Sequence, residues 1–428
     1  MTSTLKVALL GAGTVGAEVA RILNQDESVL TARVGARLAL SAVVVRNVEA
    51  DRGPNVPREL LTQDADAAID GADIVIELMG GIEPARTYIS RALSAGKSVV
   101  TGNKALLAEH GVELFALAAA NNAQLSFEAA VAGAIPILRP LAESLAGDTI
   151  TKVMGIVNGS TNFILDKMDR EGADLADVMD EASALGYLEA DPSADVEGHD
   201  AAAKAAILAM LAFGAPFSID QVHTEGITAV TAADVEAAKA GDQVIKLLAI
   251  VERSEAGVQM RVHPTLISRD HPLAAVRGAF NAVFVEAENA GELMFYGPGA
   301  GGAPTASAVM GDVVTAARRT LAGAPDQLVF STEPVAALPV QDSVTRYALA
   351  LQVADAPGVL ARIAQVFADH GVSIEAMRQS GQPGVDAAAE LRIITHAGTQ
   401  RALDATVAAV NDLDVVTGIT SVLRVEGN

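Results

Sequence analysis

The residues best suited to chemistry lie in one short stretch, positions 186–207, which reads GYLEADPSADVEGHDAAAKAAI. Carboxylates crowd its first half, and a single lysine, Lys204, stands where an apolar run begins. The pattern from about position 196 is helical, so Asp200 and Lys204 occupy positions i and i+4 on one face, with Leu208 and Leu211 below them. The spacing predicts a carboxylate and an amine in contact beside an apolar stripe.

This pair has two interpretations. It is either a helix-stabilising ion pair worth about 0.3 to 0.5 kcal/mol or part of a catalytic site. In the second case burial lowers the pKa of the lysine while the aspartate opposes the fall, and such an amine can take and return a hydroxyl proton. Glu189, Asp195 and Asp200 would then suit a cationic group such as an ammonium. We favour a site, because a dinucleotide motif occurs elsewhere in the chain.

That motif is a glycine-rich turn near the start. Gly11, Gly13 and Gly16 belong to GAGTVG, which also holds Thr14 and Val15 and lies between the apolar run KVALL and the helical pattern AEVARIL. Glycines here allow a tight turn and close approach of a pyrophosphate, whose charge the helix N-terminus stabilises. A merely tight turn is the competing interpretation, which this position between the first strand and the first helix disfavours.

The end of the second predicted strand bears on the choice of cofactor. A carboxylate there would accept the ribose 2′-hydroxyl of NAD, but the sequence is Val43-Val44-Val45-Arg46-Asn47. Arg46 can pair with a 2′-phosphate instead, so we expect NADP, with NAD possible. The alternative is that Arg46 is a solvated charge on a loop.

Lys104 follows the fourth predicted strand, in the sequence Thr101-Gly102-Asn103-Lys104. Ligands of open α/β sheets bind beyond the carboxyl ends of the strands. Lys104 is therefore a candidate for positioning substrate or cofactor, or for moving a proton. A surface lysine at a helix start is an equally good interpretation.

Three other segments can bring polar backbone to a ligand. Glu128 begins a corner, EAAVAGAIP, where free carbonyl oxygens could bind a hard cation, although most such corners bind nothing. The segment NGSTNF at 158–163 offers capping groups and could do no more than cap a helix. The run YGPGAGGAPTAS at 296–307 leads into a helical pattern, which predicts a site contribution through Gly311 or its neighbours rather than a flexible linker.

A parallel sheet is needed to position these residues. Short β-branched runs at 7–10, 38–45, 74–78, 98–101 and 125–127 alternate with helical patterns, which is typical of βαβ units. Ala-rich helices then mix with strands as far as about Glu288 and indicate an α+β domain. After a proline-containing linker, the tail has strands at 347–353, 388–395 and near 419–425, and helices at 359–370 and 399–413, in a βαββαβ-like order.

Composition excludes several classes of protein. The chain has 428 residues, a formal net charge of −23 and no cysteine. The acidic balance argues against nucleic acid, whose phosphates need clustered Lys and Arg. The lack of cysteine excludes disulfides, thiol nucleophiles and Cys-ligated zinc. We see no signal peptide and no run of roughly 18 apolar residues that would suggest a membrane helix, so we expect a cytoplasmic protein.

Together the motifs resemble one family. GAGTVG, TGNKALLA, FEAAVAGAIPI, GIVNGSTNFIL and LGYLEADPSADVEGHDAAAK are similar to segments of homoserine dehydrogenases of the longer form, which carry a C-terminal ACT regulatory domain. The resemblance implies a Rossmann-type dinucleotide-binding domain, an α+β catalytic domain and a βαββαβ ACT domain. It also implies NAD(P)-dependent interconversion of L-homoserine and L-aspartate 4-semialdehyde, on the branch leading to threonine, methionine and isoleucine.

The resemblance implies roles for the candidate residues. Lys204 is the expected general acid/base, with Asp200 beside it and Lys104 as a second catalytic or cofactor-contacting lysine. Glu189 matches the ligand for the substrate amino group, and Asp195 is a further substrate-binding candidate. A sodium site would use Glu128 with the carbonyl groups of Val131, Gly133 and Ile135. The expected cofactor contacts are Gly11, Gly13, Thr14, Val15, Gly16, Arg46, Thr101, Lys104 and Gly311.

The implied domain limits are 1–145 for dinucleotide binding, completed by about 300–323, then 146–299 for catalysis and dimerisation, a linker at 324–345 and an ACT domain at 346–428. The turn DAPGVL at 355–360 resembles an ACT effector site at a subunit interface. We therefore expect threonine as effector and a homodimer or homotetramer. The alternatives are a dehydrogenase of another small amino or hydroxy acid, and a non-catalytic amino-acid sensor, which the intact Lys104, Glu189, Asp200 and Lys204 disfavour.

Overall fold

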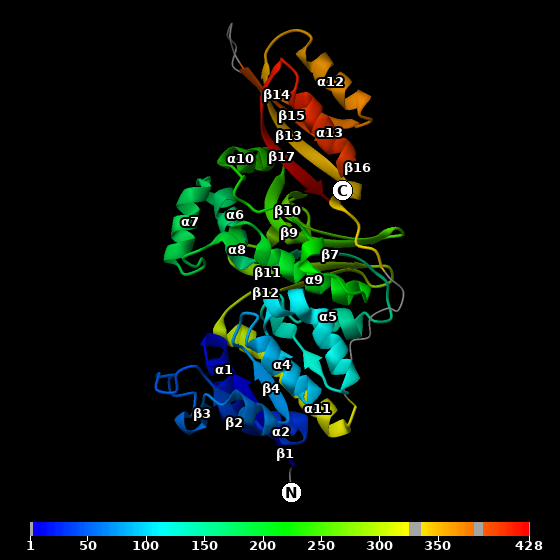
Figure 1. Ribbon diagram of the computed structural model, residues 1–428. Coiled ribbons are helices and arrows are strands. Elements are labelled where there is room, and N and C mark those ends of the chain that lie inside the picture. The colour runs from blue at the N-terminus through cyan, green and yellow to red at the C-terminus, as the bar shows by residue number, and fades with distance from the viewer. Residues whose placement is uncertain (1–2, 325–334, 381–387, 428) are drawn as a thin grey trace.

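Six parallel strands form a sheet in the order β3-β2-β1-β4-β5-β6 at the N-terminal end of the computed structural model (Figure 1). The structure describes residues 3–324, 335–380 and 388–427. The strands are β1 (Thr4–Leu10), β2 (Arg37–Val44), β3 (Leu61–Thr62), β4 (Ile74–Glu77), β5 (Ser98–Thr101) and β6 (Leu125–Ser126). β4 and β5 are buried along their whole length, as expected when helices cover both faces of a parallel sheet.

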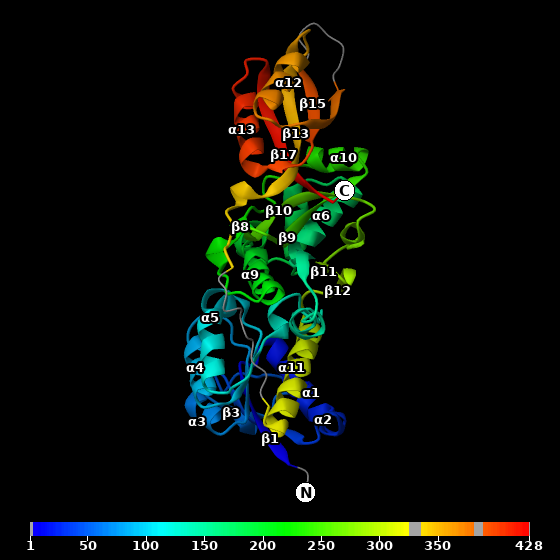
Figure 2. The ribbon, with the colours of Figure 1, turned by 90° about the vertical axis from the view of Figure 1, so that its right-hand side faces the viewer.

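The helices of this unit come from two parts of the chain. They are α1 (Thr14–Gln25), α2 (Glu27–Val34), α3 (Ala65–Asp70), α4 (Ala85–Ser94), α5 (Lys104–Ala120) and, from much later, α11 (Gly302–Ala322). α11 packs against α1, α2 and β5 and lies beside α1 in Figure 2. Ala306, Val309 and Val313 on α11 are buried in the same core as Leu9 of β1. This packing brings the loop before α11 close to the glycine-rich turn.

The middle unit is a mainly antiparallel sheet with helices packed on it. Its strands are β7 (Ile150–Ile156), β8 (His223–Thr224), β9 (Gln243–Ser254), β10 (Gly257–Ser268), β11 (Phe280–Ala287) and β12 (Gly291–Pro298), and β8 pairs in parallel with β10. Its helices are α6 (Gly159–Glu171), α7 (Leu175–Ala184), α8 (Ser193–Val196), α9 (His199–Phe213) and α10 (Ala232–Ala240). One core cluster includes Leu10 of β1, Phe127 and Leu208 of α9. The first two units therefore share a hydrophobic core, which fixes α9 relative to the first sheet.

The C-terminal unit has the predicted βαββαβ order and its own core. Its elements are β13 (Val344–Ala354), α12 (Val359–Asp369), β14 (Ile374–Ser380), β15 (Ala388–Thr395), β16 (Gly398–Thr399), α13 (Gln400–Asn411) and β17 (Val416–Glu426). β17 pairs in parallel with β10, so the last two units share an eleven-stranded sheet. Glu426 lies in this junction, 2.7 Å from both Nη2 of Arg261 and Nζ of Lys152.

The predicted fold class is confirmed, with adjustments in detail. The helical pattern expected from about position 196 is broken, because Gly198 adopts a left-handed φ of 86° between α8 and α9. Residues 325–334 of the predicted linker lie outside the described residues, whereas Ala336 and Leu338 form backbone hydrogen bonds to Val258 of β10. The domain limits stay predictions. In the described part of the chain, no helix is long and apolar enough to cross a membrane.

Candidate functional site

A cavity of about 650 Å³ lies where the first sheet meets the middle unit. Its lining comes from the loops after β4 and β5, the segment 129–133, the N-terminus of α6, the helix α9 and the loop 299–301. Lys104, Asp195, Asp200 and Lys204 all line it, although they lie up to a hundred positions apart in the sequence. The fold thus brings four of the predicted site residues together at the carboxyl ends of parallel strands, where open α/β sheets bind ligands.

Lys204 is the most enclosed of the four. It lies on α9 and is 8% exposed. Its Nζ donates to the backbone oxygen of Val157 at 2.6 Å and to Oδ2 of Asp200 at 2.7 Å, so a charged Lys204 keeps one donor for a ligand. Burial lowers the pKa of Lys204, and the carboxylate of Asp200 opposes that fall. The amine therefore gives up its proton more readily than an exposed lysine.

Asp200 is the anionic centre of the site. Its Oδ2 accepts from Lys204 and, at 2.9 Å, from Nδ2 of Asn158, while its Oδ1 pairs with Nζ of Lys104. Burial alone would raise the pKa of Asp200, but the ammonium groups of Lys204 and Lys104 outweigh burial and hold that pKa below its usual range. Asp200 therefore stays ionised and does not serve as a proton donor.

Asn158 donates hydrogen bonds to both Asp200 and a second carboxylate, that of Asp195. Its Nδ2 also donates to Oδ1 of Asp195 at 2.6 Å, while its Oδ1 accepts from the backbone N–H of Thr161 and caps α6. Burial raises the pKa of the half-buried Asp195, and the hydrogen bond from Asn158 opposes the rise. The segment 158–163 was predicted to offer capping groups, either to a ligand or to the helix alone, and the bridging role of Asn158 was missed because one side chain performs both tasks.

Lys104 and Glu189 are less enclosed. Lys104 begins α5, and its side chain is 45% exposed although its Nζ contacts Asp200. Glu189 is exposed between α7 and α8 and does not line the cavity, whereas its neighbours Gly186 and Tyr187 do. The assignment of Glu189 to the substrate amino group stays a prediction.

A second cavity of about 500 Å³ opens beside the glycine-rich turn. Gly11, Gly13 and Arg46 line it, and Gly80 lines both this cavity and the one around Lys204. An elongated ligand held by the turn can therefore extend past Gly80 towards Lys204.

The turn itself fits a dinucleotide. A Cβ on Gly16 would lie 2.2 Å from the backbone oxygen of Gly11, and Gly11 has a left-handed φ of 100°, so both positions require glycine. No side chain caps the N-terminus of α1, which begins with Thr14 and Val15. Its free N–H groups suit a pyrophosphate.

Two arginines lie at the end of this cavity. Arg46 follows β2 and is exposed, and its backbone oxygen accepts from Gln63. Arg52 also lines the cavity, donates through Nη1 to the backbone oxygen of Ala12 at 3.3 Å, and has a buried Nε without a partner. Arg52 was not predicted, although a second arginine six positions after Arg46 was a signal for it.

Thr101 lies behind the cavities and lines neither. Its Oγ1 donates to Oε2 of Glu77 at 2.6 Å and accepts from the backbone N–H of Asn103. Asn103 in turn donates to the backbone oxygen of Gly81. In this structure Thr101 supports the loops that line the site, and its direct contact with cofactor stays a prediction.

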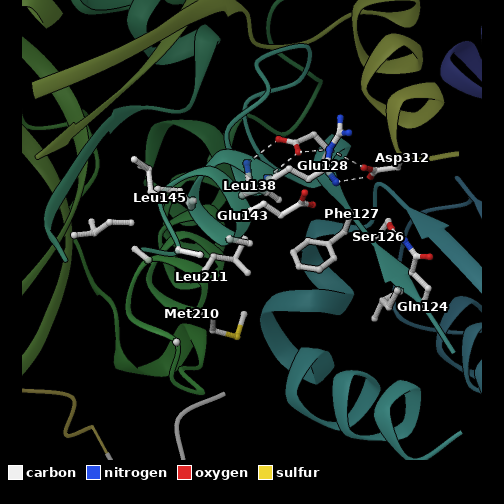
Figure 3. A pocket seen from close by; sticks show the side chains of 18 of the residues that line it. Gln124, Ser126, Phe127, Glu128, Leu138, Glu143, Leu145, Met210, Leu211 and Asp312 are labelled. Carbon is white, nitrogen blue, oxygen red and sulfur yellow. Dashed lines mark hydrogen bonds and ion pairs between the residues drawn. The ribbon is translucent and has the colours of Figure 1, made fainter. Parts of the chain in front are cut away.

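A third cavity, of about 440 Å³, is lined by residues 124–128, by side chains between 138 and 150, by the C-terminal end of α9 and by Asp312 and Arg319 of α11 (Figure 3). Figure 3 shows Glu128 and Asp312 close together at its polar end, with Phe127, Met210 and Leu211 on its apolar side. Burial raises the pKa of Asp312 to about 7.

Gly311 belongs to this third region. A Cβ there would lie 2.8 Å from Nη2 of Arg139, so the glycine makes room for a guanidinium. Gly311 lines neither of the first two cavities, whereas Gly301 and Thr305, before and within the first turns of α11, line the one around Lys204. The site contribution of the glycine-rich run thus comes from residues nearer its start.

Glu128 has no free lone pair for a cation. Its Oε1 accepts from the N–H groups of Ile137 and Leu138, and its Oε2 from the N–H and Nε of Arg139. Among the described residues, no group of three or more His, Asp or Glu side chains could hold a metal ion. A sodium ion here would depend on the backbone oxygens of Glu128, Val131, Gly133 and Ile135 alone.

Comparisons with known proteins agree with this geometry. The family model for "Homoserine dehydrogenase, NAD binding domain" matches residues 11–128, the one for "Homoserine dehydrogenase" matches 136–314, and the one for "ACT domain" matches 347–415. Homoserine dehydrogenases of Mycobacterium tuberculosis and Corynebacterium glutamicum are 54% and 51% identical, over 98% and 99% of this chain and 97% and 96% of theirs.

Solved structures agree as well. A homoserine dehydrogenase from Thiobacillus denitrificans superposes with a TM-score of 0.93 at 40% identity, covering 99% of both chains. A hyperthermophilic archaeal homoserine dehydrogenase, solved in complex with NADPH, superposes with a TM-score of 0.65 at 31% identity, over 76% of this chain and 99% of its own.

Proposed function

The chain belongs to the homoserine dehydrogenase family, and from this premise we propose how its residues carry out the reaction. The enzyme is an NAD(P)-dependent oxidoreductase with a C-terminal ACT domain, and it interconverts L-homoserine and L-aspartate 4-semialdehyde. The bound cofactor supplies the hydride chemistry at C4 of the substrate. The protein supplies orientation and the proton at the C4 oxygen.

Lys204 handles that proton. In the oxidation its neutral amine takes the proton of the C4 hydroxyl, and in the reduction its ammonium returns one to the carbonyl oxygen. The observation that supports this role is the setting of Nζ, which is buried, bonded to Val157 and Asp200, and on the wall of the cavity. Asp200 fixes the position of the amine and stabilises its charged form.

Lys104 polarises or positions the same oxygen. Because its Nζ contacts the other oxygen of Asp200, the two amines face one carboxylate from two sides. The charge of Lys104 adds to burial in lowering the pKa of Lys204. The more exposed Lys104 also lies near the loops after β4 and β5, where the cofactor enters the cavity.

The substrate ammonium binds on the acidic side of the cavity. Asp195 lines that wall and holds an oxygen towards Asn158. Glu189 joins it when the segment between α7 and α8 brings its carboxylate inward, a role that rests on the resemblance to the family.

NADP is the preferred cofactor. Arg46 and Arg52 both line the second cavity, where their guanidinium groups could hold a 2′-phosphate, and the residues directly after β2, Val45-Arg46-Asn47, include no carboxylate. NAD would bind more weakly. A sodium ion at the backbone oxygens of 128–135 is at most a structural addition to this site.

Threonine is the proposed feedback inhibitor, acting on the ACT domain through the turn at 355–360. A homodimer or homotetramer would supply the subunit interface that such effector sites use. The resemblance supports both statements.

Initial-rate kinetics with NADPH and NADH in parallel, with aspartate semialdehyde, test the function. We expect turnover with both and a lower KM for NADPH. Turnover of another aldehyde but not of aspartate semialdehyde would contradict the assignment. Adding threonine to the same assay tests the effector.

A further inference from the structure

Asn281 on β11 is a buried amide without a partner. It is 1% exposed, and neither its Nδ2 nor its Oδ1 has a hydrogen bond. In the described part of the chain, every other buried side chain with an unpartnered polar atom keeps a hydrogen bond or an ion pair. An unpaired buried amide is costly, so it requires an explanation outside the fold itself.

Its position supplies that explanation. Asn281 lines the same cavity as Lys204 and does not line the cavity beside the glycine-rich turn. A Cβ on Gly299 would lie 2.1 Å from its Cγ, and a Cβ on Gly159 would lie 3.3 Å from its Oδ1. The amide therefore lies between the loop before α11 and the first residue of α6.

The start of α6 is electropositive. Asn158 caps the helix through the N–H of Thr161, which leaves the N–H groups of Gly159 and Ser160 without an intrahelical acceptor. Both residues line the cavity. The exposed N–H groups and the helix dipole favour an anion at this point.

We infer that Asn281 binds the α-carboxylate of the amino-acid substrate through Nδ2, beside the N–H groups of Gly159 and Ser160. Its Oδ1 accepts a hydrogen bond from the neighbouring α-ammonium. An α-amino acid places an acceptor and a donor on adjacent atoms, which matches the donor and acceptor of one primary amide. This inference rests on the proposed function, because it assumes an amino-acid substrate with its C4 oxygen at Lys204.

The nicotinamide carboxamide has the same complementarity, but the position of Asn281 favours the substrate. The amide borders α6 rather than the loops after β4 and β5 or the glycine-rich turn. To reach it, the substrate must displace the backbone at Gly299. In that segment Gly299, Gly301 and Gly302 carry no side chain and Ala300 carries only a methyl group.

Kinetics of Asn281→Ala and Asn281→Leu test the inference, with Asn24→Ala as a surface amide control. We expect both Asn281 variants to lower kcat/KM for homoserine by about ten- to a hundred-fold, the range for a hydrogen bond to a charged group. The KM for NADP should stay within about twofold of wild type. The leucine variant should melt at or above the wild-type temperature, because it replaces an unpaired buried amide with an apolar group of similar size.

A substrate lacking the carboxylate, 3-aminopropan-1-ol, distinguishes a contact of Asn281 with the carboxylate from a general effect on the site. The alcohol keeps the ammonium that donates to Oδ1 but lacks the carboxylate. Its kcat/KM, or its inhibition constant against homoserine if turnover is too slow, should therefore change less in both variants than the kcat/KM for homoserine does. An equal loss for this alcohol and homoserine would overturn the inference. So would a raised KM for NADP alone, which would assign the amide to nicotinamide, or a lower melting temperature of the leucine variant with unchanged kinetics. If wild type itself fails to oxidise homoserine, the proposed function fails instead.

Discussion

Replacing Asp200 by asparagine removes a negative charge that contacts both Lys104 and Lys204 while keeping the shape of the side chain. Nζ of Lys204 lies 2.7 Å from Oδ2, and at an effective dielectric constant of about 20 this separation corresponds to an attraction of about 6 kcal/mol. Burial already lowers the pKa of Lys204, and Asp200 opposes the fall. In the variant Lys204 should therefore lose its proton at a lower pH than in wild type.

Because the pKa of Lys204 is lower in the variant than in wild type, the two directions of the reaction should respond differently. Reduction of the semialdehyde needs the charged form of Lys204, so its rate at neutral pH should fall by about a hundred-fold or more, within the range that general acid catalysis contributes. Oxidation of homoserine needs the neutral form. Its rate should fall less, and its rise with pH should shift towards acid.

Single-turnover measurements of NADPH absorbance, in both directions and across about pH 6 to 9, would isolate hydride transfer from product release. Asp191→Asn is a matched control, because Asp191 is an exposed carboxylate of the same segment, bonded to the N–H of Ser193. An unchanged pH dependence, or equal losses in the two directions, would refute the electrostatic role of Asp200.

Three other changes have distinct expected outcomes. Arg52→Ala should raise the KM for NADPH by about ten- to a hundred-fold and leave the KM for NADH within about twofold. Arg58→Ala, which changes an exposed arginine, is the control. Equal effects on the KM for both cofactors would contradict a contact between Arg52 and the 2′-phosphate. The pKa of Asp312 is raised by burial to about 7, so its stabilising contribution is present below about pH 4 and lost as pH rises to 7. Asp312→Asn should therefore lose less thermal stability than wild type between about pH 5 and pH 8. The difference has an upper limit of about 3 kcal/mol, from the roughly two pH units between pH 5 and the pKa, and parallel losses would argue against this titration. Glu426→Gln leaves the 1% exposed Arg261 without its closest carboxylate and should cost about 3 to 5 kcal/mol of stability. Thermal melting measures this loss, with Glu375→Gln, which removes a more exposed ion pair, as the control. Equal melting temperatures of the two variants would count against the junction as a stabilising contact.

Local patterns predicted most strands of the first sheet, but they predicted neither its short strand β3 nor the pairing of strands distant in the sequence. The runs at 74–78 and 98–101 are rich in Ile and Val, as a strand buried on both faces requires, and both strands are present. β3 is only two residues long and carries no such signal. The pairing of β10 with β17 joins Thr265–Ile267 to Arg424–Glu426, and no local pattern specifies a partner so distant in the sequence.

In the site, too, contacts within one element were predicted from the sequence, whereas contacts between distant elements were not. The i, i+4 spacing predicted the contact of Asp200 with Lys204, because helix geometry alone determines it. The approach of Lys104 to Asp200 depends on the packing of the first two units and was supported only by the resemblance. Asn281 gave one weak signal, a polar residue in the apolar strand FNAVFVEA, and only the lack of any partner in the folded chain distinguishes it.

The central claim is that the amine of Lys204 carries the proton of the reaction. Its most direct test is the single-turnover rate of hydride transfer from NADPH to aspartate semialdehyde in Lys204→Ala. We expect a loss of about 10² to 10⁴-fold with NADPH affinity kept, because Lys204 does not line the cavity beside the glycine-rich turn. A rate near that of wild type, with the same pH dependence, would contradict the account.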